Sequence, residues 1–256
     1  MIKSFKLFES YSEIKSICDR YHVENWELNP ETGLVDVFGD VGLQYSSLKK
    51  LPLKFGIVSG GFYCHHNQLT SLEGAPQSVG GDFYCYENQL TSLEGAPQIV
   101  GGDFDCYQNK LTTLEGSPKS VGGNFDVYKT QLVTLSGGPN SVGGNFICNH
   151  NKLTSLEGSP QTVGGDFYCN NNQIKDFKVP EYSLNEEVEF ECRENPIFEI
   201  YKLFNTPKCI DLLNEYGAIG DGVISRVKLE EVFLELDLEV PNLKIDFHAS
   251  KNWKLV

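Results

Sequence analysis

The sequence predicts a repeat solenoid in which a parallel β-sheet joins the coils, and three periodic patterns indicate this fold. Leucine, proline and phenylalanine each recur every 21 residues through the middle of the chain. The positions are Leu72, Leu93, Leu114, Leu135 and Leu156; Pro76, Pro97, Pro118, Pro139 and Pro160; and Phe62, Phe83, Phe104, Phe125, Phe146 and Phe167. A unit of this length buries its apolar face only by stacking on copies of itself. We therefore expect an elongated scaffold.

Each unit is expected to contain one short strand. Phe83 and Cys85 alternate with Tyr84 and Tyr86, so the first two should point inward and the last two outward. The return segment contains Gly-Ala-Pro or Gly-Ser-Pro, which is too short and too broken for a regular helix. The opposite side of each coil should therefore be extended and turn-like.

An asparagine recurs just after the predicted strand. It occupies the same position in most units, as Asn67, Asn88, Asn109, Asn151 and Asn172. A buried asparagine can bond backbone groups of its own coil and of the adjacent coil, which would otherwise lack partners. We predict a ladder of such bonds along the solenoid.

A cysteine recurs within the strand, at Cys64, Cys85, Cys106, Cys148 and Cys169. Val127 replaces it in one unit, so the position requires a small apolar side chain and not thiol chemistry. We predict free, buried cysteines with no disulfide or metal, as suits a reducing cytosol.

The run Phe-x-Cys-x-x-Asn-x-Leu-x-x-Leu resembles the leucine-rich repeat (LRR), whose signature is L-x-x-L-x-L-x-x-N/C-x-L. The short period with a proline on the return segment is most similar to the bacterial effector subclass. The Leu-Glu-Gly-(Ala/Ser)-Pro and Val-Gly-Gly phrases also resemble LRR proteins encoded in bacteriophage genomes. One position departs from the signature, because Gly80, preceded by Val79, stands where the first leucine belongs. The geometry of that turn is not predicted.

The repeat extends beyond its clean copies, and this sets the expected domain boundaries. Val41 lies one period before Phe62, and Phe190 repeats Phe167 with two residues inserted. We expect about eight coils within a solenoid of residues 35–196, and a sheet on the order of 35 Å long at a strand spacing of about 4.8 Å. Residues 1–34 should form an N-terminal helix and hairpin cap, and residues 197–256 a C-terminal helical cap.

Both ends carry patterns that differ from the repeat. Glu9 to Tyr21 has apolar residues at helical spacing, and Trp26 to Val37 is expected to form a hairpin. Ile197 to Tyr216 and Ser225 to Leu236 are predicted to be helices. A solenoid needs terminal units that cover its open core, so we interpret these segments as caps.

The formal net charge of −14 disfavours a nucleic-acid binder, because phosphate neutralisation needs clustered Lys and Arg. A protein partner with a basic or mixed surface is the natural complement. Residues Met1 to His22 have no uninterrupted apolar stretch, so we expect neither a signal peptide nor a membrane anchor. The expected location is the cytoplasm, or the host cytoplasm if a phage encodes the protein.

The outward strand positions are the expected partner-binding site. They form a Tyr/Asp-rich concave face made of Tyr63, His65, Asp82, Tyr84, Tyr86, Asp103, Asp105, Tyr107, Asp126, Tyr128 and Tyr168. Rigid aromatic residues supply contact area and carboxylates take Arg or Lys. Tyr86, Tyr107 and Tyr128 should form a continuous stripe. The alternative is that the stacked tyrosines only stabilise neighbouring strands.

No catalytic residue, metal site or cofactor is predicted. His65 and His66 lie four coils from His150, about 19 Å away, so we interpret all three as solvated surface residues. The Gly-Gly-Asp phrase lacks the shorter period of calcium-binding repeats. Cys209-Ile210-Asp211 resembles a ubiquitin-ligase motif, but only about 60 residues follow the repeats and the segment is apolar.

These observations favour a non-enzymatic protein-binding module, with a host protein or a host-defence component as the target that the phage resemblance implies. Two alternatives remain open at this point. One is a structural or homo-oligomeric assembly protein, although a monomer or weak homo-oligomer is expected. The other is an adaptor that binds through the acidic segment from Glu181 to Glu194, which contains Glu186, Glu187, Glu189 and Glu191.

Overall fold

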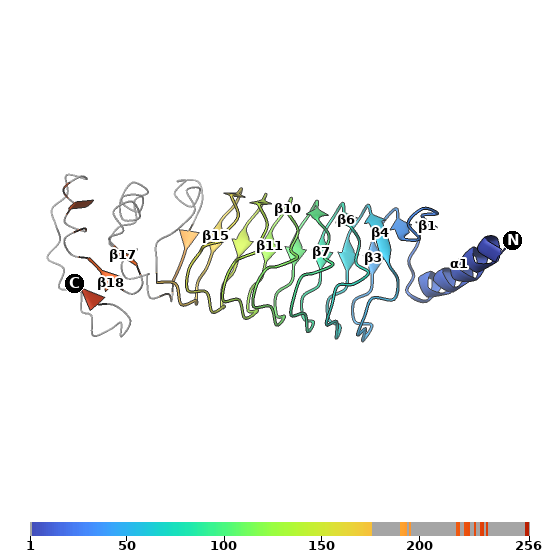
Figure 1. Cartoon of the computed structure of the whole chain (residues 1–256), viewed down its shortest axis with the longest axis horizontal. Coiled ribbons are helices and arrows are strands. Elements are labelled where there is room, and N and C mark those ends of the chain that lie inside the picture. The colour runs from blue at the N-terminus through green and yellow to red at the C-terminus, as the bar shows by residue number, and fades with distance from the viewer. Residues whose placement is uncertain are drawn as a thin grey trace.

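The computed structural model describes residues 2–175, 190–193, 195, 219–220, 223–225, 228, 231–232, 234 and 254–255. Within these ranges the chain forms a parallel β-solenoid of about six turns with a 21-residue period. Figure 1 shows the coils stacked side by side along the long axis of the molecule. The predicted repeat solenoid is confirmed.

One sheet, called sheet B here, contains the strands that the sequence predicted. Its strands are β3 (Val41–Gly42), β5 (Phe62–Tyr63), β7 (Phe83–Tyr84), β9 (Phe104–Asp105), β11 (Phe125–Asp126), β13 (Phe146–Ile147), β15 (Phe167–Tyr168) and β16 (Phe190–Glu191). Neighbouring strands are parallel and pair residues one period apart, such as Phe83 with Phe104, except that β15 and β16 pair Phe167 with Phe190. The outer strands β3 and β16 pair with β5 and β15. The predicted count of eight coils stays a prediction.

A second sheet, sheet A, was not predicted. Its strands are β1 (Trp26–Leu28), β2 (Val35–Val37), β4 (Phe55–Val58), β6 (Ser78–Val79), β8 (Ile99–Val100), β10 (Ser120–Val121), β12 (Ser141–Val142) and β14 (Thr162–Val163). β1 and β2 form the predicted antiparallel hairpin, and the other strands are parallel. Each coil therefore has two short strands, one in each sheet. Val79 and its equivalents are buried in the core, as the phenylalanines are.

The Gly-Gly pair joins the two strands of each coil, and this resolves the turn at Gly80. The backbones of adjacent coils come very close here. A Cβ atom added at Gly101 would overlap the carbonyl oxygen of Gly80, and one added at Gly122 would overlap that of Gly101. Glycine is required at this corner because only a residue without a Cβ lets adjacent backbones approach so closely.

The core is a regular stack of identical side chains. Neighbouring phenylalanine rings lie parallel at centroid distances of 5.5 Å for Phe62 and Phe83 and 5.3 Å for Phe83 and Phe104. The repeated cysteines are fully buried and free, as predicted. Burial raises the pKa of the Cys64 and Cys169 thiols well above their ordinary value, so these groups stay protonated and act as small apolar side chains.

The predicted asparagine ladder is present. Nδ2 of Asn88 donates to the carbonyl oxygens of Cys64 in the adjacent coil, at 3.0 Å, and of Cys85 in its own coil, at 3.1 Å. Oδ1 of Asn88 accepts from the backbone N–H of Leu69 at 2.9 Å. Equivalent bonds form at Asn109, Asn151, Asn172 and Asn195. Buried Thr130 takes the place of asparagine in one coil.

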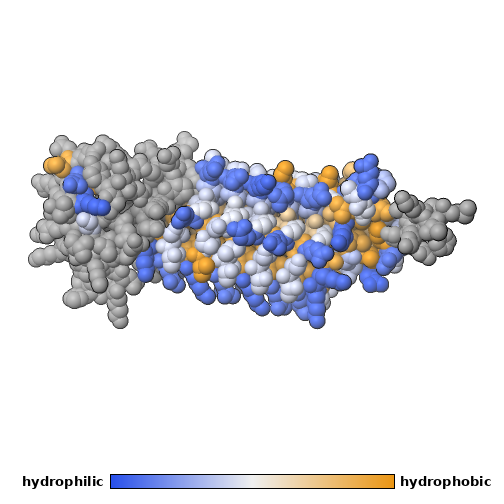
Figure 2. Space-filling model, in the orientation of Figure 1, coloured by the Kyte–Doolittle hydropathy of each residue, from blue (hydrophilic) through white to orange (hydrophobic). Residues whose placement is uncertain are grey.

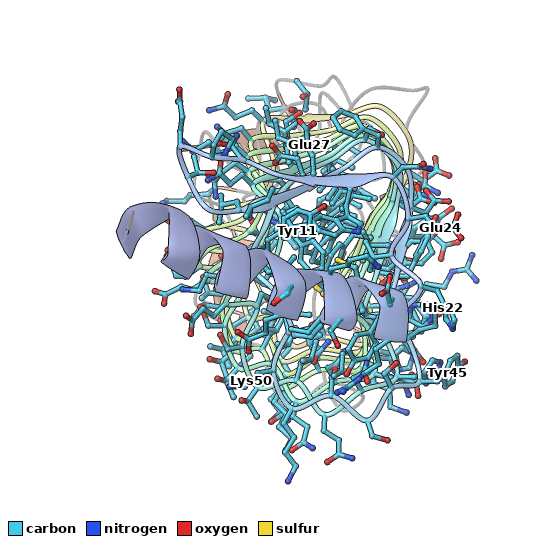
Figure 3. The ribbon with its side chains drawn as sticks, turned by 90° about the vertical axis from the view of Figure 1, so that its right-hand side faces the viewer. Tyr11, His22, Glu24, Glu27, Tyr45 and Lys50 are labelled. Atoms are coloured by element: carbon cyan, nitrogen blue, oxygen red, sulfur yellow. The ribbon has the colours of Figure 1, made fainter. Side chains whose placement is uncertain are left out.

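The helix α1 (Ile2–Arg20) begins earlier than the sequence predicted. Cys18 of α1 is buried, and Ile14 and Ile17 pack against the core. The ring of Tyr11 lies 5.3 Å from that of Trp26 in β1. Figure 3 looks along the solenoid from its N-terminal end and shows α1 crossing in front of the coils. No helix in the described ranges is both long enough and apolar enough to span a membrane.

The C-terminal part contains a three-stranded sheet of β17 (Ile219–Gly220), β18 (Val223–Ile224) and β19 (Lys254–Leu255), which the sequence did not predict. The predicted helix from Ile197 to Tyr216 lies outside the described residues. Within the predicted helix from Ser225 to Leu236, the structure describes helical residues at 228, 231–232 and 234. The domain boundaries at 34/35 and 196/197 stay predictions.

Candidate functional site

The outward side chains of sheet B form two columns along the solenoid. The face column contains Tyr63, Tyr84, Asp105, Asp126, Ile147 and Tyr168, and the outer column contains His65, Tyr86, Tyr107, Tyr128, Asn149 and Asn170. The parallel register aligns the members of each column one per coil. All of them are half-buried except His65, which is buried. Figure 2 shows hydrophilic residues along both margins of the coil stack, with a mixture of pale, hydrophilic and hydrophobic residues between them.

A third column, the corner column, follows the Gly-Gly pairs and contains Asp82, Asp103, Asn124, Asn145 and Asp166. Oδ1 of Asp82 accepts from the backbone N–H of Asp103 at 2.9 Å, and Oδ1 of Asp103 accepts from that of Asn124 at 2.7 Å. Asn124 makes the same bond to the N–H of Asn145 at 2.8 Å. Asp82 and Asp103 thus have a structural role that the site prediction missed. The exchange of Asp and Asn along the column was the available signal, because both side chains carry Oδ1.

Three rings of the outer column form an aromatic stack of His65, Tyr86 and Tyr107. The centroids of His65 and Tyr86 lie 4.4 Å apart at 17°, and those of Tyr86 and Tyr107 lie 4.3 Å apart at 9°. Tyr128 does not continue the stack; its ring instead makes an edge contact with His150 at 5.2 Å and 78°. The predicted stripe of Tyr86, Tyr107 and Tyr128 is therefore correct for the first two residues and wrong for the third.

More aromatic rings surround the N-terminal end of this stack. Tyr63 and Tyr84 lie 5.3 Å apart, and Tyr84 and Tyr86 lie 5.9 Å apart. Tyr45 stacks on His66 at 4.4 Å and 13° and is 70% exposed. Figure 3 labels Tyr45 at the edge of the first coil. The site prediction missed Tyr45, although its position 21 residues before His66 was the available signal.

His65 is not the solvated surface residue that the sequence predicted. It is 9% exposed, and its Nδ1 is buried without a hydrogen-bond partner. Burial lowers the pKa of His65, and the neighbouring His66 lowers it further, so the imidazole is neutral at pH 7. His66 is half-buried, with its Nδ1 2.9 Å from a carboxylate oxygen of Glu87. Only His150 is exposed as predicted.

Asp105 and Asp126 are paired in register on adjacent coils and are both half-buried. Burial raises the pKa of Asp105 to about 7, and the nearby Asp126, Asp103 and Asp82 add to the shift. Burial likewise raises the pKa of Asp126 to about 6, although its carboxylate accepts a 2.7 Å bond from the backbone N–H of Tyr128. These two side chains hold negative charge at a cost that a cation would relieve.

Two tyrosines of the face column bond to the corner column. The Tyr84 hydroxyl donates to Oδ2 of Asp82 at 3.1 Å, and the Tyr168 hydroxyl donates to Oδ2 of Asp166 at 2.9 Å. Burial, followed by the charge of Asp82, raises the pKa of Tyr84. The phenol is therefore fixed in its protonated form. This bond holds the hydroxyl of Tyr84 against the corner column.

The remaining candidate residues do not form a site in the described part of the chain. Within the described ranges, no three His, Cys, Asp or Glu side chains are grouped as metal ligands would be. Glu191 of the predicted acidic segment lies in β16, where it accepts a 2.8 Å bond from Nδ2 of Asn170 and pairs with Arg193 at 3.2 Å. Glu186, Glu187, Glu189 and Cys209 lie outside the described residues.

The coil stack resembles a solved structure, the LRR domain of an effector from Shigella. The two chains superpose with a TM-score of 0.51 and 21% sequence identity, over 76% of this chain and 80% of that one. At this level of identity the likeness shows the fold alone, which is an LRR solenoid. No family model matches the sequence, and no curated protein matches it.

Proposed function

We propose that this protein is a non-enzymatic, protein-binding module that recognises its partner through the face column and the outer column of sheet B. The observation that carries the proposal is the gathering of half-buried aromatic rings beside two carboxylates of raised pKa on one continuous face. Aromatic residues dominate the binding energy of protein interfaces because they bury a large area at a low entropy cost.

The charge of the molecule favours a basic partner surface. The chain carries a formal net charge of −14, and Asp105 and Asp126 lie in the middle of the aromatic face. A negative surface attracts a basic partner at long range and speeds its association. The LRR fold supports a protein partner because its outward strand positions form an extended surface suited to macromolecules.

The target that we propose to test first is a protein of a host cell. This part of the proposal is based on the resemblance of the repeat phrases to phage-encoded LRR proteins and on the fold shared with the Shigella effector domain. The proposed location is the cytoplasm of that host. We propose a monomer or a weak homo-oligomer as the binding form.

The test is affinity capture from host cells with a variant in which Tyr86, Tyr107 and Tyr128 are replaced by Ala. Each truncation of a central aromatic residue should cost on the order of 2 kcal/mol of binding, whereas loss of packing along the strands costs a few tenths to about 1 kcal/mol per pair. The variant should therefore fold, as checked by circular dichroism, and fail to capture the partner.

A matched control replaces Ile57 and Ile99 by Ala. Both are exposed apolar residues, 55% and 58% exposed, and both lie on sheet A. This control should capture the partner at full strength. If the tyrosine variant folds and still captures the same partner, the sheet B face is not the binding site. The same capture with Glu186, Glu187 and Glu189 replaced by Gln then tests the adaptor alternative, and mass determination in solution tests the assembly alternative.

A further inference from the structure

The aromatic stack of the outer column stops at one particular place. His65, Tyr86 and Tyr107 cover one another at 4.4 and 4.3 Å, close to the strand spacing of about 4.8 Å. Tyr128 turns to His150 instead, and in the described ranges no ring contact joins Tyr107 to Tyr128. The ring face of Tyr107 that is turned away from Tyr86 therefore has no aromatic partner. We call this interruption the stack gap.

The stack gap coincides with the two unusual carboxylates. Asp105 lies in the same coil as Tyr107, and Asp126 lies in the same coil as Tyr128, so the acid pair flanks the gap in the adjoining column. Asp105 is close enough to Tyr84, Tyr86 and Tyr107 for its charge to raise the pKa of all three phenols. Among the described residues, neither carboxylate has a cationic partner.

The same face contains a second group whose bonding is incomplete. Nδ1 of His65, at the other end of the stack, is buried without a hydrogen-bond partner. Buried polar atoms of native proteins nearly always have such a partner, and leaving one unpaired costs free energy. The free face therefore has two deficits, an unpaired imidazole nitrogen and an unneutralised acid pair. Of the two, only the acid pair lies beside the stack gap, and a bound cation would neutralise it.

An arginine side chain matches the stack gap better than other cations do. Guanidinium is planar, it stacks on aromatic faces, and its forked donors suit carboxylate oxygens. Ammonium of lysine carries the same charge but offers no plane to stack. A metal ion does not fit, because within the described ranges no group of three His, Cys, Asp or Glu side chains could hold one.

We propose that the stack gap binds an arginine side chain of the protein partner, with the guanidinium lying against the ring of Tyr107 and donating to Asp105 and Asp126. This inference rests on the proposed function and specifies the chemistry of the partner. Binding of the cation stabilises both carboxylates in their charged form, so the complex releases protons at pH 6 to 7. The titratable groups near Asp105 are Asp82, Asp103 and Asp126, the phenols of Tyr84, Tyr86 and Tyr107, and the buried thiol of Cys85. Glu87 lies next to Tyr107, and Ile147 of β13 adds no titratable group.

The test is an NMR titration of the full chain, with labelled aspartate carboxyl groups and tyrosine rings, against three peptides. They are acetyl-Gly-Arg-Gly-amide, the same peptide with lysine, and the same peptide with citrulline, a neutral analogue that keeps the shape of arginine. The arginine peptide should shift the signals of Asp105, Asp126 and Tyr107, and should bind at least about tenfold more tightly than the citrulline peptide. It should also bind more weakly at pH 5 than at pH 8, since the acid pair is protonated at the lower pH.

Two variants and one matched control identify the residues responsible. Asp105→Asn with Asp126→Asn keeps the shape and should weaken binding of the arginine peptide about tenfold. Glu94→Gln with Glu115→Gln removes the same charge from exposed positions and should change it by less than about twofold. Tyr107→Leu should remove the preference for arginine over lysine.

The proposal is wrong if the arginine and citrulline peptides bind equally, if the double aspartate variant binds like the native chain, or if the shifted signals belong to other residues. These outcomes are independent of the capture experiment. The triple tyrosine variant can fail to capture the partner while the native chain does not bind the arginine peptide. That result would support the proposed function and contradict only the arginine subsite.

Discussion

Asp103 and Asp105 are separated by a single residue, and the solenoid uses them in opposite ways. Asp103 belongs to the corner column, where its Oδ1 accepts the backbone N–H of Asn124 at 2.7 Å. Asp105 belongs to the face column, where it lies beside Asp126 and has a pKa raised to about 7. The backbone N–H next to Asp103 needs an acceptor. Asp105 instead lies near three other carboxylates, those of Asp82, Asp103 and Asp126. Phe104 lies between them in the core.

This difference shows how a repeat separates structure from recognition. In the corner column Asp and Asn replace one another, because the bond to the next coil needs one oxygen and no charge. At Asp105 of the face column burial and the nearby carboxylates disfavour the charge, which therefore lowers stability at neutral pH. A residue that the fold does not need is the stronger candidate for binding. Substitutions of Asp103, Phe104 and Asp105 test this interpretation directly.

The largest effect is expected at Phe104, which serves as the reference for structural importance. Phe104→Ala should lower the free energy of unfolding by roughly 3 to 5 kcal/mol, because a fully buried ring would leave a cavity between Phe83 and Phe125. Urea denaturation measures this change. An unchanged midpoint would mean that the inward register of β9 is wrong.

The next effect is expected at Asp103 and depends on the substitution. Asp103→Ala should cost about 1 to 2 kcal/mol of unfolding free energy, because the half-buried N–H of Asn124 loses its acceptor. Asp103→Asn should cost no more than a few tenths, since Oδ1 is kept. Equal losses in both variants, measured by the same denaturation series, would show that charge and not the bond matters in the corner column.

Asp105 should respond in the opposite direction. Its pKa is about 7 in the folded chain against an ordinary value of 3.8, so the folded state binds the proton more tightly than the unfolded chain does. Stability from this group is therefore present in full below about pH 4 and is lost as the pH rises to about 7.

Asp105→Asn should raise the free energy of unfolding by about 1 kcal/mol at pH 7.5 and change it little at pH 4. Thermal melts at the two pH values measure the difference. A loss of stability at pH 7.5 would place Asp105 among the structural residues, and the contrast with Asp103 would disappear.

The smallest effect is expected at Thr130, where the asparagine ladder is interrupted. The Thr130 hydroxyl lies 2.8 Å from Oδ1 of Asn151 and 3.2 Å from the carbonyl oxygen of Val127, and its one proton serves only one of them. Thr130→Asn should raise the free energy of unfolding by about 0.5 to 1 kcal/mol, because an amide supplies two donors and an acceptor. Thr130→Val, which removes the hydroxyl, is the control and should destabilise the chain.

The periodic residues determined most of what could be predicted about the fold. The alternation of Phe83 and Cys85 with Tyr84 and Tyr86 gave the strands of sheet B, and the recurrence of Asn88 gave the ladder. Sheet A was missed because Ser78–Val79 has only two residues and one inward side chain, which is too short to show an alternating pattern. The role of the glycines depends on contact between coils, which the sequence of one coil does not display.

The sequence predicted where the residues of the candidate site lie, but not which side chains contact one another. The register placed Asp105 next to Asp126 and Tyr86 next to Tyr107, as the structure has them. The turn of Tyr128 toward His150 was missed, because the equivalent position in the next coil is Asn149, which offers no ring to stack on. Side-chain conformation depends on such neighbours. Burial of His65 also depends on five surrounding rings that no single coil contains, those of Tyr45, Tyr63, His66, Tyr84 and Tyr86.

The ladders make the length of the molecule adjustable in whole steps. The corner bonds join Asp82 to residue 103 and Asp103 to residue 124, so each coil presents to the next the same acceptors that it receives from the one before. Removing 21 residues from one corner to the next would reconnect equivalent partners, and duplicating them would do the same. The reach of the protein would then change by one strand spacing, about 4.8 Å, with the cross-section preserved. Such a chain can be shortened or lengthened by gene recombination without redesign of its interior.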